Sequence, residues 1–143
     1  MTRPRVYAAH PMTSYGTAHE RASLTMLAEL FGSAEIVNPA ERYESDAEWL
    51  RDWPRLLGSL SGLVLFSDEH GTIGAGCLRE IADAIAAGVP VGYLDPYFGL
   101  CELGGLDFLP VPMRTRASTA WPIAGERSTL RHFADRSWRC PDE

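Results

Sequence analysis

The chain contains no lysine, no run of basic residues and no stripe of arginines. Its 13 basic residues are all arginines, and 19 acidic residues leave a formal net charge of −6. Proteins that bind polymeric nucleic acid need a basic surface, so this balance argues against that class of partner. A small anionic ligand needs only one or two local donors, and here an arginine would have to neutralise its charge.

Cysteine is scarce, and long apolar runs are missing. The three cysteines, Cys77, Cys101 and Cys140, are odd in number and lack the spacing of metal ligands, which favours reduced thiols and predicts neither a zinc site nor another cofactor. Neither an N-terminal apolar signal nor an apolar segment of membrane-spanning length is present. We therefore expect a cytoplasmic protein that does not bind membranes.

Strand and helix signals alternate along the first two thirds of the chain. Short apolar runs predict strands at 6–9, 35–37, 62–66 and 90–94, and helical spacing predicts helices at 17–31, 45–60 and 77–87. Pro54 should break or restart the second helix. The alternation predicts an α/β fold with a doubly wound, mainly parallel sheet flanked by helices, Rossmann-like or flavodoxin-like.

The length of 143 residues and a hydrophobic content of 45% predict a single domain. We expect its core at 5–95, followed by an irregular extension at 96–143 with a late strand at 108–113 and a helix at 127–138. The aromatic, proline-rich segment at 97–121 offers apolar contact surface, so we expect a homodimer or a higher homo-oligomer.

The segment from Ser67 to Glu80 follows the third predicted strand and opens a helix. Ligands of doubly wound sheets bind outside the carboxyl ends of the strands, and glycines at such a turn let backbone N–H groups approach a ligand. Glu80 stands about one turn into the helix and can reach the same pocket. Alternatively, the glycines only form a tight turn, and Glu80 is an acid favoured by the helix dipole.

Four short pieces of sequence occur together in order and spacing. They are Tyr7-Ala8-Ala9-His10-Pro11-Met12-Thr13, Asn38-Pro39-Ala40-Glu41, Gly76-x-x-x-Glu80 and Gly88-Val89-Pro90-Val91. Together they resemble the nucleoside 2-deoxyribosyltransferase-like superfamily over residues 5–95, and most closely its small members. The resemblance implies an enzyme that cleaves the base–sugar bond of a nucleoside or nucleoside monophosphate through a covalent glycosyl-glutamate.

The same resemblance implies roles for three residues. Glu80 would be the nucleophile, and Tyr7 would orient it through a hydrogen bond, although core packing explains a tyrosine there as well. A second acid should protonate the departing base. We expect Asp68 in that role, with Glu69 as the second choice.

The residues expected to bind substrate lie on the loops after the first and third strands: His10, Met12, Thr13, Ser14, Tyr15, Gly71, Thr72, Gly74 and Gly76. His10 replaces the family's usual glycine and could narrow the pocket or add a donor. Ser61 replaces an aspartate of many relatives, so base recognition should differ. We expect a nucleoside monophosphate to bind better than its parent nucleoside, with Arg21 or Arg79 neutralising the phosphate. The competing expectation is that Glu80 and Asp68 repel the phosphate and the ligand is a neutral nucleoside.

Other features admit simpler interpretations. Trp49, Trp53 and Leu57 follow helical spacing and predict a packing face, with a base-stacking platform as the alternative. His19 and the acidic cluster at 41–48 predict solvated surface. Cys77 stands near a helix N-terminus but has no assignable histidine partner.

Gly74-x-Gly76-Cys77-x-x-Glu80 also resembles the signature of phosphoribohydrolases that release free base from nucleoside monophosphates, with Cys77 in place of threonine. The resemblance to the small deoxyribosyltransferase-like members favours hydrolysis, with a nucleoside deoxyribosyltransferase as the alternative. A non-catalytic nucleotide-binding sensor and a purely structural subunit remain as alternative functions.

Overall fold

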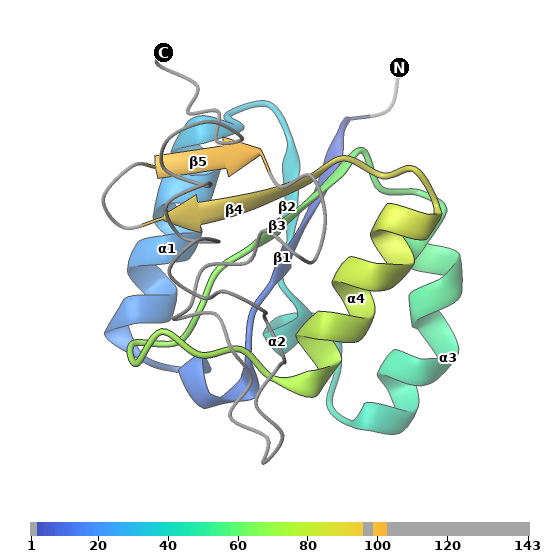
Figure 1. Cartoon of the computed structure of the whole chain (residues 1–143), viewed down its shortest axis with the longest axis horizontal. Helices are drawn as coiled ribbons and strands as arrows, with labels where there is room; N and C mark the ends of the chain where they lie inside the picture. The colour runs from blue at the N-terminus through green and yellow to red at the C-terminus, as the bar shows by residue number, and fades with distance from the viewer. Residues whose placement is uncertain (1–2, 96–98, 103–143) are drawn as a thin grey trace, which may run out of the picture.

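The predicted alternation of strands and helices is present in the folded chain. A computed structural model describes residues 3–95 and 99–102 (Figure 1). Its elements are β1 (Arg5–Ala9), the 3-10 turn η1 (Met12–Ser14), α1 (Ala18–Leu30), β2 (Glu35–Val37), α2 (Pro39–Arg42), α3 (Asp46–Leu57), β3 (Gly62–Leu65), α4 (Ala75–Ala86), β4 (Val91–Asp95) and β5 (Gly99–Glu102).

The strands form one sheet in the order β2-β1-β3-β4-β5. The pairs β1–β2, β1–β3 and β3–β4 are parallel, and β5 lies antiparallel to β4. Helix α1 covers one face of the sheet, and α3 and α4 cover the other (Figure 1). The chain therefore has the predicted α/β fold, Rossmann-like, with a mainly parallel sheet. The order reverses direction at β1 and β3, which marks the expected place for a ligand.

Alternation along β1 and β3 separates two hydrophobic clusters. Tyr7 and Leu63 belong to the cluster under α3 and α4, whereas Val6 and Val64 belong to the cluster under α1. These side chains are all buried, as expected for parallel strands covered on both faces. The alternation is what directs Tyr7 toward the α3 and α4 side, where the pocket described below lies.

Side-chain caps fix where the helices begin and end. Thr17 and Ser45 each accept a hydrogen bond from a backbone N–H of the first turn, at the starts of α1 and α3. Gly88 has φ +75° one residue beyond the cap of α4 and ends that helix as predicted. Asn38 caps the short helix α2, with Pro39 in its first turn. We did not predict α2, although Asn-Pro is a known start signal.

Two details differ from the sequence predictions. Helix α3 passes through Pro54 and ends at Leu57, so the predicted break is wrong. Pro54 lies on the exposed side, where water can satisfy the carbonyl that loses its helical partner, while Trp53 and Leu56 hold the helix on the sheet. Strand β5 lies where we expected irregular chain. The strand and helix predicted at 108–113 and 127–138 fall outside the described residues.

A membrane-spanning helix would need a long apolar stretch. Among residues 3–95 and 99–102, no helix is long and apolar enough to cross a bilayer.

Candidate active site

A pocket of about 590 Å³ lies beside the carboxyl ends of β1, β2 and β3. Its walls come from the segment after β1, from α2 and the first turns of α3, and from the first turns of α4. This is the location that the sheet topology predicts for a ligand, and the volume suits a small molecule.

The pocket gathers most of the predicted site residues. Those that line it are Tyr7, His10, Met12, Thr13, Tyr15, Gly74, Gly76 and Glu80. Four others do not line it: Ser14, Asp68, Gly71 and Thr72. Each of the four belongs to a turn that supports the pocket but does not form its wall.

Glu80 is the buried carboxylate of the pocket, with 5% of its surface exposed. The Tyr7 hydroxyl and the Trp49 indole N–H both donate hydrogen bonds to Oε2, the indole at 2.9 Å. Within the described part of the chain, the other carboxylate oxygen, Oε1, accepts no hydrogen bond. One oxygen is thus held and the other is left for a ligand in the pocket.

Burial raises the pKa of Glu80 to about 7, although the hydrogen bonds from Tyr7 and Trp49 lower it in part. Asp83, one turn further along α4, adds a negative charge that raises the pKa again. The carboxylate therefore titrates near neutral pH, so that both the ionised and the protonated form are populated there.

Tyr7 is fully buried, and its ring packs at 4.9 Å against the ring of Trp53. Burial and the neighbouring Glu80 raise the pKa of Tyr7 far above its usual range, so the phenol keeps its proton and donates it in a hydrogen bond. The residue fulfils both interpretations of the sequence: it packs in the core and it holds the glutamate.

Asp68 differs from its predicted role. Oδ1 accepts hydrogen bonds from the N–H groups of His70 and Thr72, and Oδ2 accepts from the hydroxyls of Thr13 and Thr72, all at 2.7–3.0 Å. Burial alone would raise the pKa of Asp68, but these hydrogen bonds outweigh it and hold the pKa well below its usual range. An anion held in this way organises the loop after β3 and is a poor proton donor.

Glu69, the second choice for the acid, is exposed and lies 3.7 Å from the exposed ring of His70. It does not line the pocket either. Neither predicted acid is therefore placed to protonate a ligand bound there.

Three residues of the loop after β1 face the pocket with different chemistry. Met12 is 69% exposed and lies at the rim, and the half-buried Tyr15 forms an aromatic part of the wall. The Thr13 hydroxyl donates its hydrogen bond to Asp68. Ser14 instead points inward, is fully buried and donates to the Pro11 carbonyl at 2.7 Å. It closes the turn η1 and does not reach a ligand.

His10 does not supply the extra donor that the sequence suggested. Both ring nitrogens lie 2.7 Å from an oxygen, Nδ1 from the Ala8 carbonyl and Nε2 from the Glu20 carboxylate. The ring also stacks on Phe66 at 4.4 Å. The other Glu20 oxygen accepts the Gly16 N–H, so the His10–Glu20 pair anchors the loop after β1. His10 therefore fills space beside the pocket.

The glycine-rich segment contributes only its second half to the pocket. Gly71, at φ +78°, and Thr72 form the turn closed by Asp68. Gly74 is the N-cap of α4 without a side-chain cap, and Gly76 stands in the first turn, where an added Cβ would meet no atom within 4 Å. The N-terminus of α4 thus faces the pocket through small residues.

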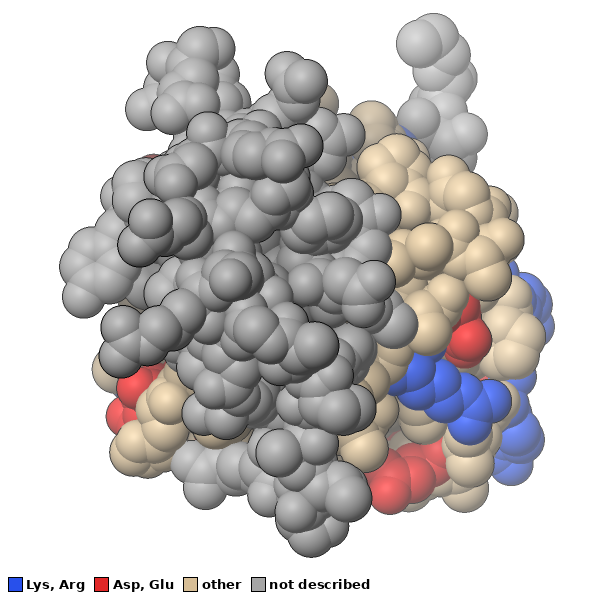
Figure 2. Space-filling model, in the orientation of Figure 1, with Lys and Arg blue, Asp and Glu red and all other residues tan. Residues whose placement is uncertain are grey.

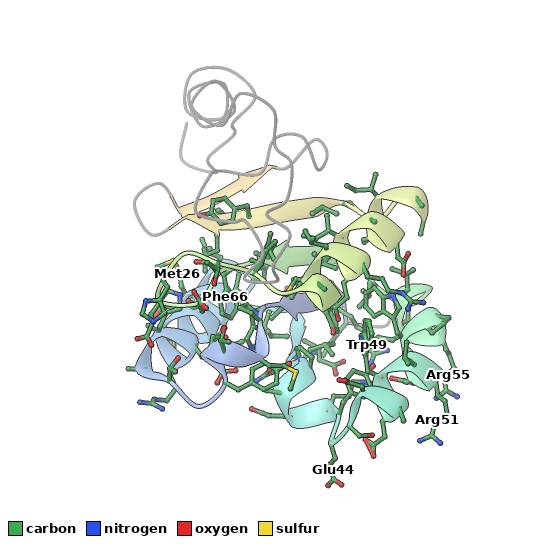
Figure 3. The ribbon with its side chains drawn as sticks, turned by 60° about the horizontal axis from the view of Figure 1, so that its bottom comes forward. Met26, Glu44, Trp49, Arg51, Arg55 and Phe66 are labelled. Atoms are coloured by element: carbon green, nitrogen blue, oxygen red, sulfur yellow. The ribbon has the colours of Figure 1, made fainter. Side chains whose placement is uncertain are left out.

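Trp49 is a pocket residue whose contact with Glu80 the sequence interpretation missed. It lines the pocket, donates to Glu80 and lies on the α4 side of α3, whereas Arg51 and Arg55 point outward (Figure 3). Trp53, one turn on, is buried and donates to Asp83 at 2.9 Å. The sequence does contain a signal for these contacts. Two tryptophans lie four residues apart on one predicted helix, and two acids lie three residues apart on another.

The acidic cluster at 41–48 is solvated as predicted, with Glu41, Glu44 and Asp46 exposed and Glu48 half-buried, whereas His19 is less solvated than predicted. Glu44 and Asp46 lie at the mouth of the pocket, and His19 is half-buried with Nε2 at 2.9 Å from the Ser67 carbonyl. The pocket wall thus carries three carboxylates, two at the rim and Glu80 inside.

The two arginines expected to bind a phosphate are not in the described pocket wall. Arg21 donates to the Gly16 carbonyl, and Arg79 lies over the ring of Trp49, 5.6 Å from its centroid, and 3.7 Å from Asp83. On the visible face, arginine side chains gather over α3 and α4 with acidic side chains beside them (Figure 2). The charge of Arg79 therefore lies on the surface between α3 and α4.

Cys77 lines the pocket but is almost fully buried, and burial followed by the charge of Glu80 raises the pKa of its thiol. A thiol in this state is a poor nucleophile. The described residues contain no group of three or more His, Cys, Asp or Glu side chains that could hold a metal ion.

Comparisons with known proteins support the fold alone. No protein-family model matches the chain, and no curated protein sequence matches it. A crystal structure of a conserved protein from Enterococcus faecalis V583 is similar, with a TM-score of 0.51 and 23% identity over 64% of this chain. The match covers 63% of that protein, less than two thirds of its length.

Proposed function

We propose that the chain is an N-glycosidase that cleaves the base–sugar bond of a nucleoside, with Glu80 as nucleophile. The observation that carries the proposal is the arrangement of Glu80: a buried carboxylate inside a ligand-sized pocket, with Oε2 held by Tyr7 and Trp49 and Oε1 left for attack. The family resemblance of the sequence leads to the same residue. Retaining glycosidases use a carboxylate in this way.

The proposed reaction has two steps. Oε1 of ionised Glu80 attacks the anomeric carbon, the bond from that carbon to the base nitrogen breaks, and the base leaves with the electron pair and takes a proton from water. Water then attacks the same carbon of the glycosyl ester, loses a proton to solvent, and releases the sugar and the carboxylate. The Trp49 indole N–H and the Tyr7 phenol, which both donate to Oε2, stabilise the carboxylate each time it reforms.

The pocket wall favours a neutral nucleoside over a nucleoside monophosphate. Glu44 and Asp46 stand at the mouth, and a phosphate dianion there would be repelled by both. Tyr15 and Tyr43 offer aromatic rings to a planar base. This supports the competing expectation from the sequence, in which carboxylates exclude the phosphate.

The direct test is release of free base from a panel of nucleosides and their 5′-monophosphates, followed by chromatography. We expect base release from at least one nucleoside. The Glu80→Gln protein is the negative control, because it retains the pocket but has no nucleophile. Equal release by both proteins would refute the proposal, and a second base in the mixture separates transfer from hydrolysis.

The charge of the pocket predicts ligand preference. Titration calorimetry of Glu80→Gln with a nucleoside and its 5′-monophosphate should show the nucleoside binding about tenfold more tightly, or more, in low salt. The difference should shrink as salt screens Glu44 and Asp46. Tighter binding of the monophosphate would contradict the electrostatic argument and would indicate that Arg21 or Arg79 binds the phosphate.

The hydrogen bonds of Asp68 predict a mild effect of Asp68→Asn. The amide oxygen can accept from the N–H groups of His70 and Thr72, and the amide NH₂ can donate to the hydroxyls of Thr13 and Thr72 after these rotate. We expect base release within about threefold of wild type and a loss of stability of about 1–2 kcal/mol. A general acid would instead lose activity by about 100-fold or more on this change.

A further inference from the structure

Helices α3 and α4 are joined by two indole–carboxylate hydrogen bonds that differ in one respect. Trp49 donates to Glu80 and Trp53 donates to Asp83, each at 2.9 Å. Only the first pair lines the pocket. The second pair lies behind it, with Trp53 almost fully buried.

The Trp49 indole is itself held in place on its other sides. The guanidinium of Arg79 lies 5.6 Å from its ring centroid, and the ring of Trp53 stacks at 6.4 Å with an interplanar angle of 30°. Arg79 also approaches Asp83 at 3.7 Å. The indole N–H therefore has little freedom to turn away from Glu80.

From this geometry we infer that Trp49 is a positioning residue for Glu80: its N–H, together with the Tyr7 hydroxyl, fixes Oε2, so that Oε1 is the oxygen presented to the ligand. The inference rests on the proposed function for its chemical meaning, and it adds a residue from α3 to the catalytic arrangement on β1 and α4. A hydrogen bond from an N–H favours the ionised carboxylate, so Trp49 also stabilises the form that attacks.

The ionisation of Glu80 can be told apart from that of its titratable neighbours. Tyr7 of β1, Tyr15 of the next loop and Cys77 of α4 all have pKa values raised by burial and then by other neighbours, so they stay protonated through neutral pH. Asp83 of α4 is a further negative charge, Arg79 of α4 is a positive charge over the Trp49 ring, and burial lowers the pKa of His10 in the pocket wall. A titration near pH 7 sensed by the Trp49 indole therefore reports Glu80.

The kinetic test compares Trp49→Phe with Trp53→Phe, its matched control on the same helix. The acid limb of the pH dependence of kcat/KM should have its midpoint near 7 in wild type, where Glu80 must lose its proton. Trp49→Phe should move this midpoint up by about one pH unit and lower the plateau about tenfold. Trp53→Phe should leave the midpoint in place, whatever it does to stability. An unmoved midpoint in Trp49→Phe overturns the inference.

A second measurement needs neither activity nor the Trp49 variant. The indole N–H resonance of Trp49, assigned by through-space connectivities, should shift with pH around a midpoint near 7 in wild type and stay constant in Glu80→Gln. A resonance that does not titrate in wild type contradicts the positioning role. If base release is absent but the resonance titrates, the proposed function fails while the coupling of Trp49 to Glu80 stands.

Discussion

Replacing Glu80 by glutamine is expected to lower kcat/KM for base release by at least about 1,000-fold. The amide is nearly isosteric but cannot form the glycosyl ester. Its carbonyl oxygen can still accept from Tyr7 and Trp49, as Oε2 does in wild type, so the pocket should keep its shape. The loss would therefore be chemical rather than structural.

The chain offers a matched control for this variant on the same helix. Asp83 accepts an indole N–H as Glu80 does, is one turn away and does not line the pocket. Asp83→Asn should retain activity within a few-fold. A Glu80→Gln protein with more than about a tenth of the wild-type rate would remove Glu80 from the nucleophile role.

The strands and the central pair of the site could be predicted from local sequence. Strands such as Gly62–Leu65 are short apolar runs closed by turn formers, and this local pattern alone finds them. Tyr7 and Glu80 come from separate segments, but each follows a motif of the resembled family, and the doubly wound topology brings the two segments to the same edge. The structure places their side chains in contact.

The errors concern interactions that depend on side-chain geometry. Asp68 was expected to act as an acid because it follows a strand, yet four hydrogen bonds turn it into a loop anchor. Of the two roles considered for His10, the donor role is wrong because Ala8 and Glu20 occupy its ring nitrogens, whereas a side chain that narrows the pocket agrees with its place in the lining. Sequence periodicity correctly assigned Trp49 to a packing face but could not show that its N–H meets Glu80, the buried carboxylate of the pocket.

The same substitution, Glu80→Gln, is expected to stabilise the protein above neutral pH. In the unfolded chain a glutamate ionises near pH 4.5, whereas burial raises the pKa of Glu80 to about 7 in the folded state. Between these values the folded state binds more protons than the unfolded state. The stability contributed by this group therefore falls as pH rises through that window, by about 3 kcal/mol in all.

Glutamine has no proton to lose and keeps the acceptor for Tyr7 and Trp49. At pH 5, where Glu80 is protonated in the fold, the variant and the wild type should have similar free energies of unfolding. At pH 8 the variant should be more stable by about 3 kcal/mol, which raises Tm by several degrees. Urea unfolding at both pH values measures this difference, and Asp83→Asn again serves as the control. Stability curves that stay parallel from pH 5 to 8 would show that Glu80 ionises at its ordinary pKa, and that the buried carboxylate is not tuned for reaction near neutral pH.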